Sequence, residues 1–503
     1  MIDWNTLLEG ISLFMSWSNF LLIIVGLAFG VTLGAIPGLT GSLGIALMLP
    51  LTFTMDPLPA FVFLISIYTG GLFGGAITAI LINTPGSPAA VATTLDGYAM
   101  TKRGLSGKAL GLAIGASSTG GLIGAIVLLI IIQPLASFAL KFGPTEMFII
   151  AVFGLTIISS IQEGGFIKSI YGGLFGILLG TVGMTSTGAM RGTFGNVQLL
   201  DGIPMIPALI GLFAVSELFV LADKKYVSNK QEGVIEQSYS SQILSGIKRV
   251  YKYPFNLLRS GSIGVFIGAL PAAGSTIASL VSYNEAKRFS KKKAEFGKGS
   301  EEGLVAAESA NNASEGGALA TMLVLGIPGS ASTAMLLGAI IMQGWVPGPR
   351  LFIDNSEVLY GIIFSVVIQV ILLLVVGAII AMLAGKIINI PNNILVPIII
   401  TFALIGSFAV RNMIFDAFLV FIFGLIGWYL RKNKYPIIAV VLGLILGPIA
   451  DKELLRSVQL HGENTMLAFI ERPVSLILII ITIIGVLTPI LMERYGKKKQ
   501  QTN

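Results

Sequence analysis

Polar residues that could bind a small ion or solute occur in two apolar stretches of this chain. The stretch 304–344 places Glu308 and Asn312 in an apolar sequence and then breaks at Pro328-Gly329-Ser330. An earlier apolar stretch ends in the same way, at Asn83-Thr84-Pro85-Gly86-Ser87. Polar side chains and helix breakers at membrane depth are costly unless they face protein or a water-filled cavity. Because this combination occurs twice in one chain, it predicts a binding site.

Two further breaks, at 37–42 and 271–275, combine the same residue types. Pro ends one helix segment, Gly permits unusual dihedral angles, and Ser or Thr can cap the next helix. A helix N-terminus offers unpaired N–H groups and the positive end of the helix dipole, which attract anions. We therefore predict that an anionic substrate binds at residues of the four breaks and the polar stretch, namely Thr40, Gly41, Ser42, Thr84, Gly86, Ser87, Gly274, Ser275, Asn311, Asn312, Gly329 and Ser330.

The short runs at the breaks contain no Lys or Arg, so neutral donors would hold the anion and release it without breaking a strong ion pair. Helix breaks also free carbonyl groups, which can coordinate Na⁺ beside Asn and Ser oxygens. The expected Na⁺ ligands are Asn83, Ser309 and Asn312. We expect no other cofactor and no catalytic residue.

Two features of these stretches have a second interpretation. The pattern Gly30-x3-Gly34-x3-Gly38 is typical of close helix packing, and packing alone explains it as well as a binding role does. Glu308 could be buried, or it could lie at the cytoplasmic interface after the basic loop 287–298.

The composition is that of a polytopic membrane protein. Of 503 residues, 54% are hydrophobic and 11% are charged, and the mean hydropathy is +0.88. A soluble protein would carry about 25% charged residues. The short alternating segments of a transmembrane β-barrel are absent. The formal charge of +7 comes from a few basic loops, which indicates positive-inside topology rather than nucleic-acid binding. There is no cysteine, which excludes disulfides and thiolate sites.

Basic loops mark the cytoplasmic side of the membrane. They lie at 102–108, 224–259, 287–298, 431–434 and 497–499. The first two are separated by four apolar segments, at about 109–139, 145–161, 166–184 and 203–222. After residue 344 the apolar segments are at about 357–384, 392–409, 413–430, 436–449 and 474–492. These numbers of crossings agree with the charge pattern.

One apolar segment, 260–283, has basic loops on both sides, so it crosses the membrane an even number of times. Because it is too short for two full spans, we predict a re-entrant hairpin of two half-helices with a break near Pro271 and Gly274. The polar region 223–259 before it is expected to be a cytoplasmic linker, with an amphipathic helix near 243–251.

The chain reads as an internal duplication. The run 30–37, GVTLGAIP, recurs as GVFIGALP at 264–271, and the two Pro-Gly-Ser motifs follow in the same order. The loops after corresponding motifs have opposite charge character, which predicts opposite orientations in the membrane. The predicted fold is an all-α polytopic membrane protein with two inverted-topology repeats, interrupted or re-entrant helices and a C-terminal helix. Its predicted parts are a first repeat at 1–222, a linker at 223–259, a second repeat at 260–450, and a C-terminal helix with a basic tail at 451–503. Such folds bind substrate at the bilayer midplane, where the repeats meet.

Several motifs resemble one known family. They are Pro37-Gly38 with Gly41; Asn83-Thr84-Pro85-Gly86-Ser87 before Leu95-Asp96-Gly97-Tyr98; Glu308-Ser309-Ala310-Asn311-Asn312-Ala313; and Gly326-Ile327-Pro328-Gly329-Ser330 with Pro347-Gly348-Pro349. Over about residues 20–450 the chain resembles the large membrane subunit, or permease, of the tripartite tricarboxylate transporter family. The resemblance implies a secondary transporter of organic carboxylates in the cell membrane, driven by an ion gradient that is usually Na⁺. It also implies two partners, a small membrane subunit and an extracytoplasmic solute-binding protein.

The leading prediction is a carboxylate:cation symporter rather than an enzyme. The alternatives are an intramembrane enzyme that acts on lipid or peptide, and a channel. An enzyme is disfavoured because the sequence has no cysteine, no paired histidines, no HExxH motif and no evident acid pair. A channel is disfavoured because no continuous polar lining is evident.

Overall fold

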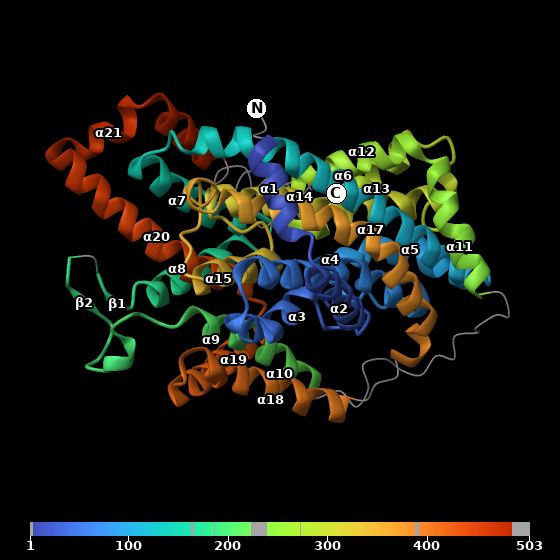
Figure 1. Ribbon diagram of the computed structural model, residues 1–503, viewed down its shortest axis with the longest axis horizontal. Helices are drawn as coiled ribbons and strands as arrows, with labels where there is room; N and C mark the ends of the chain where they lie inside the picture. Colours follow the sequence, from blue (N-terminus) through green and yellow to red (C-terminus); the bar gives the residue numbers. More distant parts are fainter. Residues whose placement is uncertain are drawn as a thin grey trace, which may run out of the picture. The chain divides into compact units, whose positions relative to one another are not determined.

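Helices make up nearly all regular structure in the computed structural model (Figure 1). The structure describes residues 4–161, 165–185, 187–222, 239–271, 273–387 and 392–484. Within these residues the only sheet is the two-stranded antiparallel pair β1 (Gly183–Met184) and β2 (Met190–Arg191). The all-α prediction is therefore confirmed.

Five of the described helices are long and apolar enough to cross a membrane. They are α2 (Trp17–Gly34), α4 (Pro57–Ile82), α6 (Ser106–Ala139), α17 (Ser356–Ile387) and α19 (Ile414–Lys432). A sixth span is possible if Ile437–Glu471 and Pro473–Ile484, bent by 68°, form one broken crossing. The chain is a multi-pass membrane protein. Of the predicted last span, residues 485–492 lie outside the described residues, as does the basic tail.

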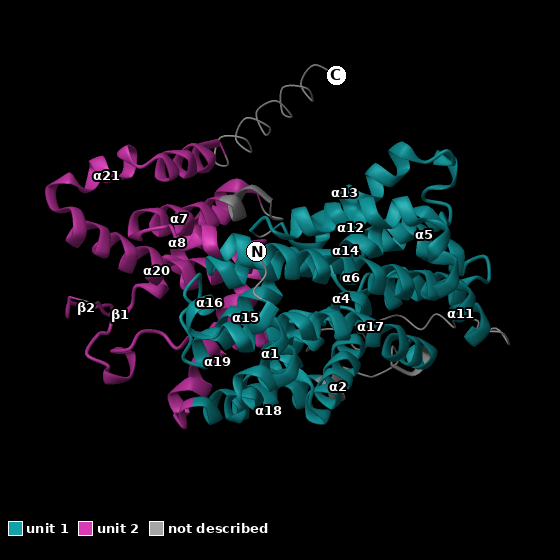
Figure 2. Ribbon diagram, turned by 45° about the horizontal axis from the view of Figure 1, so that its top comes forward, with its two compact units in different colours: residues 1–136, 217–410 teal, residues 137–216, 411–503 magenta. Residues whose placement is uncertain are grey.

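Two compact units divide the chain (Figure 2). Unit 1 contains residues 1–136 and 217–410, and unit 2 contains residues 137–216 and 411–503. Every residue predicted to bind substrate or cation lies in unit 1.

Unit 1 is arranged around α4 and α14 (Glu301–Leu325). An 18-residue stretch of α4 is entirely buried, which explains why that helix is apolar on all sides. Helices α2 and α3 (Gly41–Met48) pack on α4, and α12 (Pro254–Gly268) and α13 (Gly274–Phe289) pack on α14. The other helices of unit 1 are α1 (Trp4–Phe14), α5 (Val91–Thr101), α11 (Tyr239–Arg249), α15 (Ala331–Met342), α16 (Leu351–Asp354) and α18 (Asn392–Arg411).

Short 3-10 helices connect several of these elements. Those of unit 1 are η1 (Leu49–Thr54), η2 (Pro88–Ala90), η5 (Val250–Lys252) and η6 (Lys293–Glu295). The segment predicted to form a re-entrant hairpin contains two helices that pack on each other, α12 ending at Gly268 and α13 beginning at Gly274. The helix expected near 243–251 is α11, which ends at Arg249 and is preceded by residues outside the described part of the chain.

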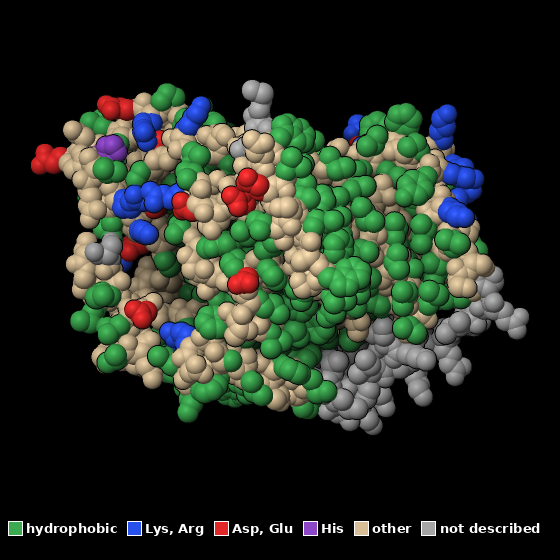
Figure 3. Space-filling view, viewed as in Figure 1, with side chains coloured by type: hydrophobic (Ala, Val, Ile, Leu, Met, Phe, Trp, Pro, Cys, Tyr) green, Lys and Arg blue, Asp and Glu red, His purple; other side chains and the backbone are tan. Residues whose placement is uncertain are grey.

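The outer surface of unit 1 agrees with a lipid environment. On α17 the side chains of Ile371, Val375 and Ile379 are all exposed, and their spacing of four residues places them on one face of the helix. On the face of unit 1 that is shown in Figure 3, hydrophobic side chains cover the middle, and basic side chains lie near α11 and α13. The last turns of these two helices carry Lys248, Arg249, Lys287 and Arg288.

A charged network joins three helix ends on the side of the basic loops. Glu301, the first residue of α14, accepts contacts from Lys108 at 2.6 Å, Arg249 at 2.7 Å and Tyr253 at 2.7 Å. Burial alone would raise the pKa of Glu301, but the hydrogen bonds from Arg249, Lys108 and Tyr253 outweigh it and lower the pKa from 4.5 to about 2.

This network predicts a pH-dependent contribution to stability. A lowered carboxyl pKa stabilises the fold fully above the unfolded pKa, and the contribution is lost as the pH falls from about 4.5 to about 2. We expect Glu301→Gln to destabilise the protein at pH 7 by on the order of 1 kcal/mol, because solvent screening weakens the pairs. Thermal unfolding at pH 7 and pH 3 would measure the difference, which should shrink at pH 3. Glu295→Gln, at an exposed ion pair, is the control and should show no such dependence; an equal effect of both variants would contradict the assignment.

Unit 2 contains α7 (Pro144–Ile161), α8 (Phe166–Gly180), η3 (Val197–Leu199), α9 (Met205–Leu209), a π-helical turn η4 (Ile210–Val215), the start of α10 (Ser216–Ala222), α19, α20 (Ile437–His461), η7 (Gly462–Asn464) and α21 (Thr465–Glu471). Helix α20 packs on α7 and α8. Glu146 in the first turn of α7 accepts from Arg472 at 2.8 Å and from Ser475 at 2.7 Å, so the segment after α21 is tied to α7.

Candidate functional site

The two long central helices of unit 1 end in the same way. Asn83 at the end of α4 has φ 54°, and Gly326 at the end of α14 has φ 70°, both in the left-handed region. Asn and Gly are the residues that adopt this conformation most readily. Each left-handed residue is followed by the Pro-Gly-Ser motif, so the chain leaves the helix sharply and can begin a new one.

The new helix after the second motif has a complete cap. Ser330 is the N-cap of α15, and its Oγ accepts a hydrogen bond from the Thr333 N–H at 3.2 Å. The Ser330 N–H in turn donates to Thr333 Oγ1 at 2.8 Å. After the first motif, Ser87 is the N-cap of η2, which leads into α5. Ser87 Oγ has no hydrogen-bond partner among the described residues and could therefore accept or donate to a ligand.

Glycines at the helix crossings make the same contacts in both halves of unit 1. A Cβ atom at Gly30 would lie 2.3 Å from the Ile67 carbonyl oxygen, and one at Gly264 would lie 2.6 Å from the Ala310 carbonyl oxygen. Such distances exclude any larger side chain without a shift of the backbone. Close packing is therefore one role of the glycines in the Gly30-x3-Gly34 pattern.

The glycines of the two Pro-Gly-Ser motifs also have matching surroundings. A Cβ at Gly86 would lie 2.2 Å from the carbonyl oxygen of Gly34, and a Cβ at Gly329 would lie 2.7 Å from that of Gly268. Gly34 and Gly268 occupy the same place in the repeated GVxxGAxP run. The first Pro-Gly-Ser motif thus packs against the end of α2, and the second packs against the end of α12.

Three of the four breaks meet near Tyr68 of α4. Tyr68 Oη lies 3.3 Å from Ser330 Oγ, and a Cβ at Gly274 would lie 3.8 Å from Ser330 Cβ. On the other side, a Cβ at Gly41 would lie 3.6 Å from the Tyr68 carbonyl oxygen. The N-terminus of α3 thus lies beside the backbone of Tyr68, and the N-termini of α13 and α15 lie next to each other at the hydroxyl end of its side chain.

The remaining predicted substrate residues belong to these same breaks. Thr40 is the N-cap of α3, and its Oγ1 lies 2.8 Å from Ser42 Oγ. Thr84 Oγ1 donates to the Ile82 carbonyl at 3.3 Å. Ser275 is the second residue of α13, and its carbonyl accepts from Ser279.

The polar residues of α14 are buried against several elements. Asn311 Nδ2 donates to the Leu72 carbonyl at 3.0 Å, and Asn312 Nδ2 donates to the Thr69 carbonyl at 3.3 Å. The Oδ1 atoms of both asparagines have no partner among the described residues. These two oxygens are therefore available to a ligand or a water molecule.

The three predicted Na⁺ ligands contact different elements. Asn83 is an exposed residue at the end of α4, Ser309 Oγ lies 3.4 Å from the Leu257 carbonyl of α12, and Asn312 faces Thr69 of α4. The structure does not show these side chains in contact with one another.

The sequence left two positions open for Glu308, buried in the protein or at the cytoplasmic interface, and the structure places it in the buried one. Its exposed fraction is 0%. One carboxylate oxygen accepts a hydrogen bond from Thr93, and the other accepts from Ser117 at 2.9 Å. The residue therefore lies inside unit 1 between α5, α6 and α14, rather than at a water interface.

Two acidic residues that were not predicted as site residues also accept hydrogen bonds next to α14. Asp96 of α5 accepts three backbone N–H groups with one oxygen, from Gly297, Gly299 and Ser300, each at 2.8 Å. It thereby holds the loop that leads into α14. Glu315, one turn beyond Asn311, is 1% exposed and accepts a hydrogen bond from Thr69 at 2.6 Å. Glu308 and Glu315 are seven residues apart, which is close to two helical turns and places them on the same side of α14. This spacing is the sequence signal that could have identified Glu315.

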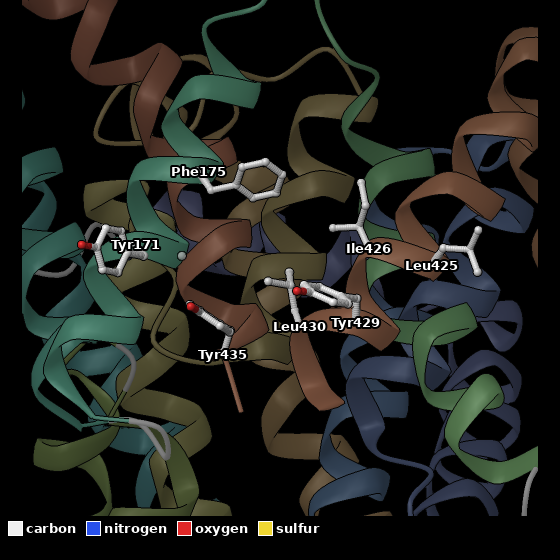
Figure 4. Close-up of a pocket in the computed structure, with 8 residues that line it drawn as sticks. Tyr171, Phe175, Leu425, Ile426, Tyr429, Leu430 and Tyr435 are labelled. Atoms are coloured by element: carbon white, nitrogen blue, oxygen red, sulfur yellow. The ribbon is translucent and has the colours of Figure 1, made fainter. Parts of the chain in front are cut away.

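A pocket of about 560 Å³ in unit 2 contains none of the predicted site residues. It lies between α8 and α19, and its lining is almost wholly apolar or aromatic (Figure 4). Tyr171 and Phe175 come from α8, and Leu425, Ile426 and Tyr429 come from α19. It offers no charged group for an anionic substrate.

Comparison with known proteins gives a family match and two curated relatives. The sequence model of the tripartite tricarboxylate transporter TctA family matches residues 20–442. An uncharacterized 52.8 kDa protein in the TAR-I ttuC' 3' region of Agrobacterium vitis is 34% identical over 482 residues, which are 95% of this chain and 95% of that protein. An uncharacterized protein in the TAR-II ttuC' 3' region of Agrobacterium vitis is 33% identical over 238 residues, 47% of this chain and 98% of that protein. No solved structure matches.

Proposed function

Since the chain belongs to the tripartite tricarboxylate transporter TctA family, we propose that it imports organic di- and tricarboxylates by cation symport, as the large permease of a binding-protein-dependent system. The observation that carries this proposal is the meeting of the α3, α13 and α15 N-termini around Tyr68. Helix N-termini are suited to carboxylate groups because their N–H groups point outward and their dipoles favour negative charge.

The proposed substrate site consists of neutral donors at the breaks. Ser330 contacts the Tyr68 hydroxyl group, Gly274 lies next to Ser330, and Gly41 lies beside the Tyr68 carbonyl group. At the break after α4, Ser87 offers a hydroxyl group that has no partner among the described residues. Each hydrogen bond to a charged group contributes about 1.5–3 kcal/mol. Several such bonds could hold a carboxylate without a permanent cationic partner, which would make release to the cytoplasm easier.

The proposed architecture is a pair of inverted repeats. Pro85 and Pro328 are 243 residues apart, and so are Thr69 and Asn312, which contact each other. The same separation relates Ile67 to Ala310, the two residues that contact the paired glycines Gly30 and Gly264. When two copies of a unit are related by a local two-fold axis, a residue near the axis contacts its own equivalent in the other copy. The contacts between residues 243 positions apart fit this pattern. An axis in the membrane plane would place the substrate at mid-depth.

The coupling cation, the partners and the membrane are part of the same proposal. Na⁺ is the expected cation, with Asn83, Ser309 and Asn312 as its predicted ligands. The family name describes a tripartite system, and we propose that this chain assembles with a small membrane subunit and an extracytoplasmic solute-binding protein in the cell membrane. The solute-binding protein would deliver the carboxylate to the site from outside.

Uptake of labelled carboxylates into proteoliposomes tests the function. The complete complex with its solute-binding protein should accumulate a di- or tricarboxylate when a Na⁺ gradient is imposed, and accumulation should stop when the gradient is collapsed. Liposomes without this subunit are the control. If no carboxylate accumulates under any cation gradient while the solute-binding protein does bind its ligand, the proposed function is wrong.

A further inference from the structure

Glu315 lies at a point where α4, α14 and α17 meet, and it is short of hydrogen-bond donors. Thr69 Oγ1 of α4 lies 2.6 Å from Glu315 Oε1, 3.1 Å from Gln369 Oε1 and 3.0 Å from the Ile65 carbonyl oxygen. A hydroxyl group carries one hydrogen, so Thr69 can donate fully to only one of these three acceptors. Glu315 Oε2 has no partner among the described residues.

The orientation of the Gln369 amide follows from its other contacts. Its Nε2 donates to the Val62 carbonyl at 3.3 Å and to Ser365 Oγ at 3.0 Å. The Ser365 hydroxyl already donates to the Ile362 carbonyl at 2.6 Å. A rotated amide would place its oxygen against the Val62 carbonyl, with no donor available. Gln369 therefore presents an oxygen, not an N–H group, to Thr69.

An additional hydrogen on Glu315 completes this arrangement. A protonated Glu315 can donate to Thr69 Oγ1, and Thr69 can then donate to Gln369 or to Ile65. The distance of 2.6 Å between Glu315 and Thr69 lies within the range of O–H···O hydrogen bonds. Without that hydrogen, two buried acceptors face each other across a single hydroxyl group, which costs free energy.

Glu308 provides an internal comparison. It lies on the same helix, seven residues earlier, and both of its oxygens have hydroxyl donors, Thr93 and Ser117. Asn311 Nδ2 lies 3.5 Å from the second of these oxygens. The shortage of donors is thus a property of the surroundings of Glu315 and not of every acidic residue in α14.

No basic side chain offsets a negative charge on Glu315 among the described ion pairs. The elements around it contribute the following titratable groups: Tyr68 from α4, Asp96 and Tyr98 from α5, Lys108 from α6, Arg259 from α12, Tyr283, Glu285, Lys287 and Arg288 from α13, Glu357 and Tyr360 from the first turns of α17 and Lys386 from its last turn, and none from η2 or α15. A buried carboxylate without a cationic partner is costly, so this site favours the neutral acid.

We propose that Glu315 is a proton-binding residue of the transport cycle, which takes up one proton at its carboxylate in the conformation described and releases it in another. Binding one proton removes one negative charge and converts an acceptor oxygen into a donor. Glu315 is connected to the proposed substrate site through α4, because Thr69 contacts Glu315 and its neighbour Tyr68 contacts Ser330. This inference rests on the proposed function. It means that a proton is transported in addition to any Na⁺.

Infrared spectroscopy of the purified, lipid-reconstituted protein tests the protonation directly. At neutral pH we expect a carboxylic-acid C=O band that shifts in D2O, is absent in Glu315→Gln and persists in Glu308→Gln. Glu315→Gln should fold, because its amide can donate to Thr69 as the acid does. If that variant fails to fold, Thr69→Val serves in its place and should shift the band by removing its hydrogen-bond partner. Absence of the band from the wild type, its persistence in Glu315→Gln, or no shift in Thr69→Val would overturn the proposal.

A transport measurement separates this inference from the proposed function. In proteoliposomes with the complete complex, Glu315→Gln should lower uptake driven by a pH gradient at least about tenfold, while exchange of internal for external carboxylate stays within about twofold of the wild type. Wild-type uptake that is insensitive to the pH gradient, or a variant that retains it, would overturn the role in the cycle. Failure of the wild type to transport any carboxylate would contradict the proposed function instead, and the infrared result would stand by itself.

Discussion

Ser330→Ala should reduce carboxylate uptake by about 10- to 100-fold while the protein still accumulates in the membrane. The range corresponds to one lost hydrogen bond to a charged group, about 1.5–3 kcal/mol. Ser330 lies at the N-terminus of α15, against Tyr68 and next to Gly274, where three helix N-termini meet. The measurement is initial uptake of labelled substrate by reconstituted complex, normalised to the amount of folded protein.

The cap of α15 supplies the control for this substitution. Ser330→Ala also removes an N-cap, which costs about 1 kcal/mol of stability. Thr333→Ala removes the other half of the same capping box but leaves the Ser330 hydroxyl group in place. If the substrate binds at Ser330, the two variants should be similarly stable and only Ser330→Ala should lose uptake. Equal losses would show that the helix cap, and not a substrate contact, is what matters.

Single cysteines placed in corresponding loops of the two halves should react from opposite sides of the membrane. The chain contains no cysteine, so each introduced thiol is unique. Residues 54 and 291 are both exposed, in the connection before α4 and the loop before α14. We expect a membrane-impermeant maleimide to label Thr54→Cys in intact cells and Lys291→Cys only after the membrane is opened. The expected difference is all or none.

A third position makes the labelling result decisive. Residue 102 lies in the first basic loop, which the charge pattern places in the cytoplasm, so Lys102→Cys should behave as Lys291→Cys does. Agreement of 102 with 291, and disagreement of both with 54, is the signature of inverted repeats. Labelling of 54 and 291 from the same face would contradict the inverted architecture and leave the family assignment untouched.

The sequence predicted those features that depend on local chemistry. The break between α12 and α13 follows from Pro271 and Gly274 in a segment too short to cross the membrane twice. The ends of α4 and α14 follow from Asn83 and Gly326 in front of Pro-Gly-Ser, because a left-handed residue followed closely by a proline is a common helix ending. The existence of the helices followed in the same way from apolar runs of spanning length.

Other features depend on contacts between distant parts of the chain and could not be predicted. Glu315 meets Thr69, which is 246 residues away, and Thr69 meets Gln369, which is 300 residues away. The local sequences of Glu315 and Glu308 do not show which of the two lacks hydrogen-bond donors, because the donors come from other helices. The composition of unit 2 from residues 137–216 and 411–503 is likewise a matter of tertiary packing and leaves no mark in the hydropathy pattern.

The loop before α14 is secured by its main chain. Asp96 binds the N–H groups of Gly297, Gly299 and Ser300, and every residue type except proline supplies an N–H group. Side chains at 291–293 are therefore free to diverge among relatives without releasing the loop. A single-residue deletion, in contrast, would move all three donors away from the carboxylate. In evolutionary terms this connection is expected to conserve its length, and its left-handed glycines Gly297 and Gly299, more strictly than the side chains at 291–293.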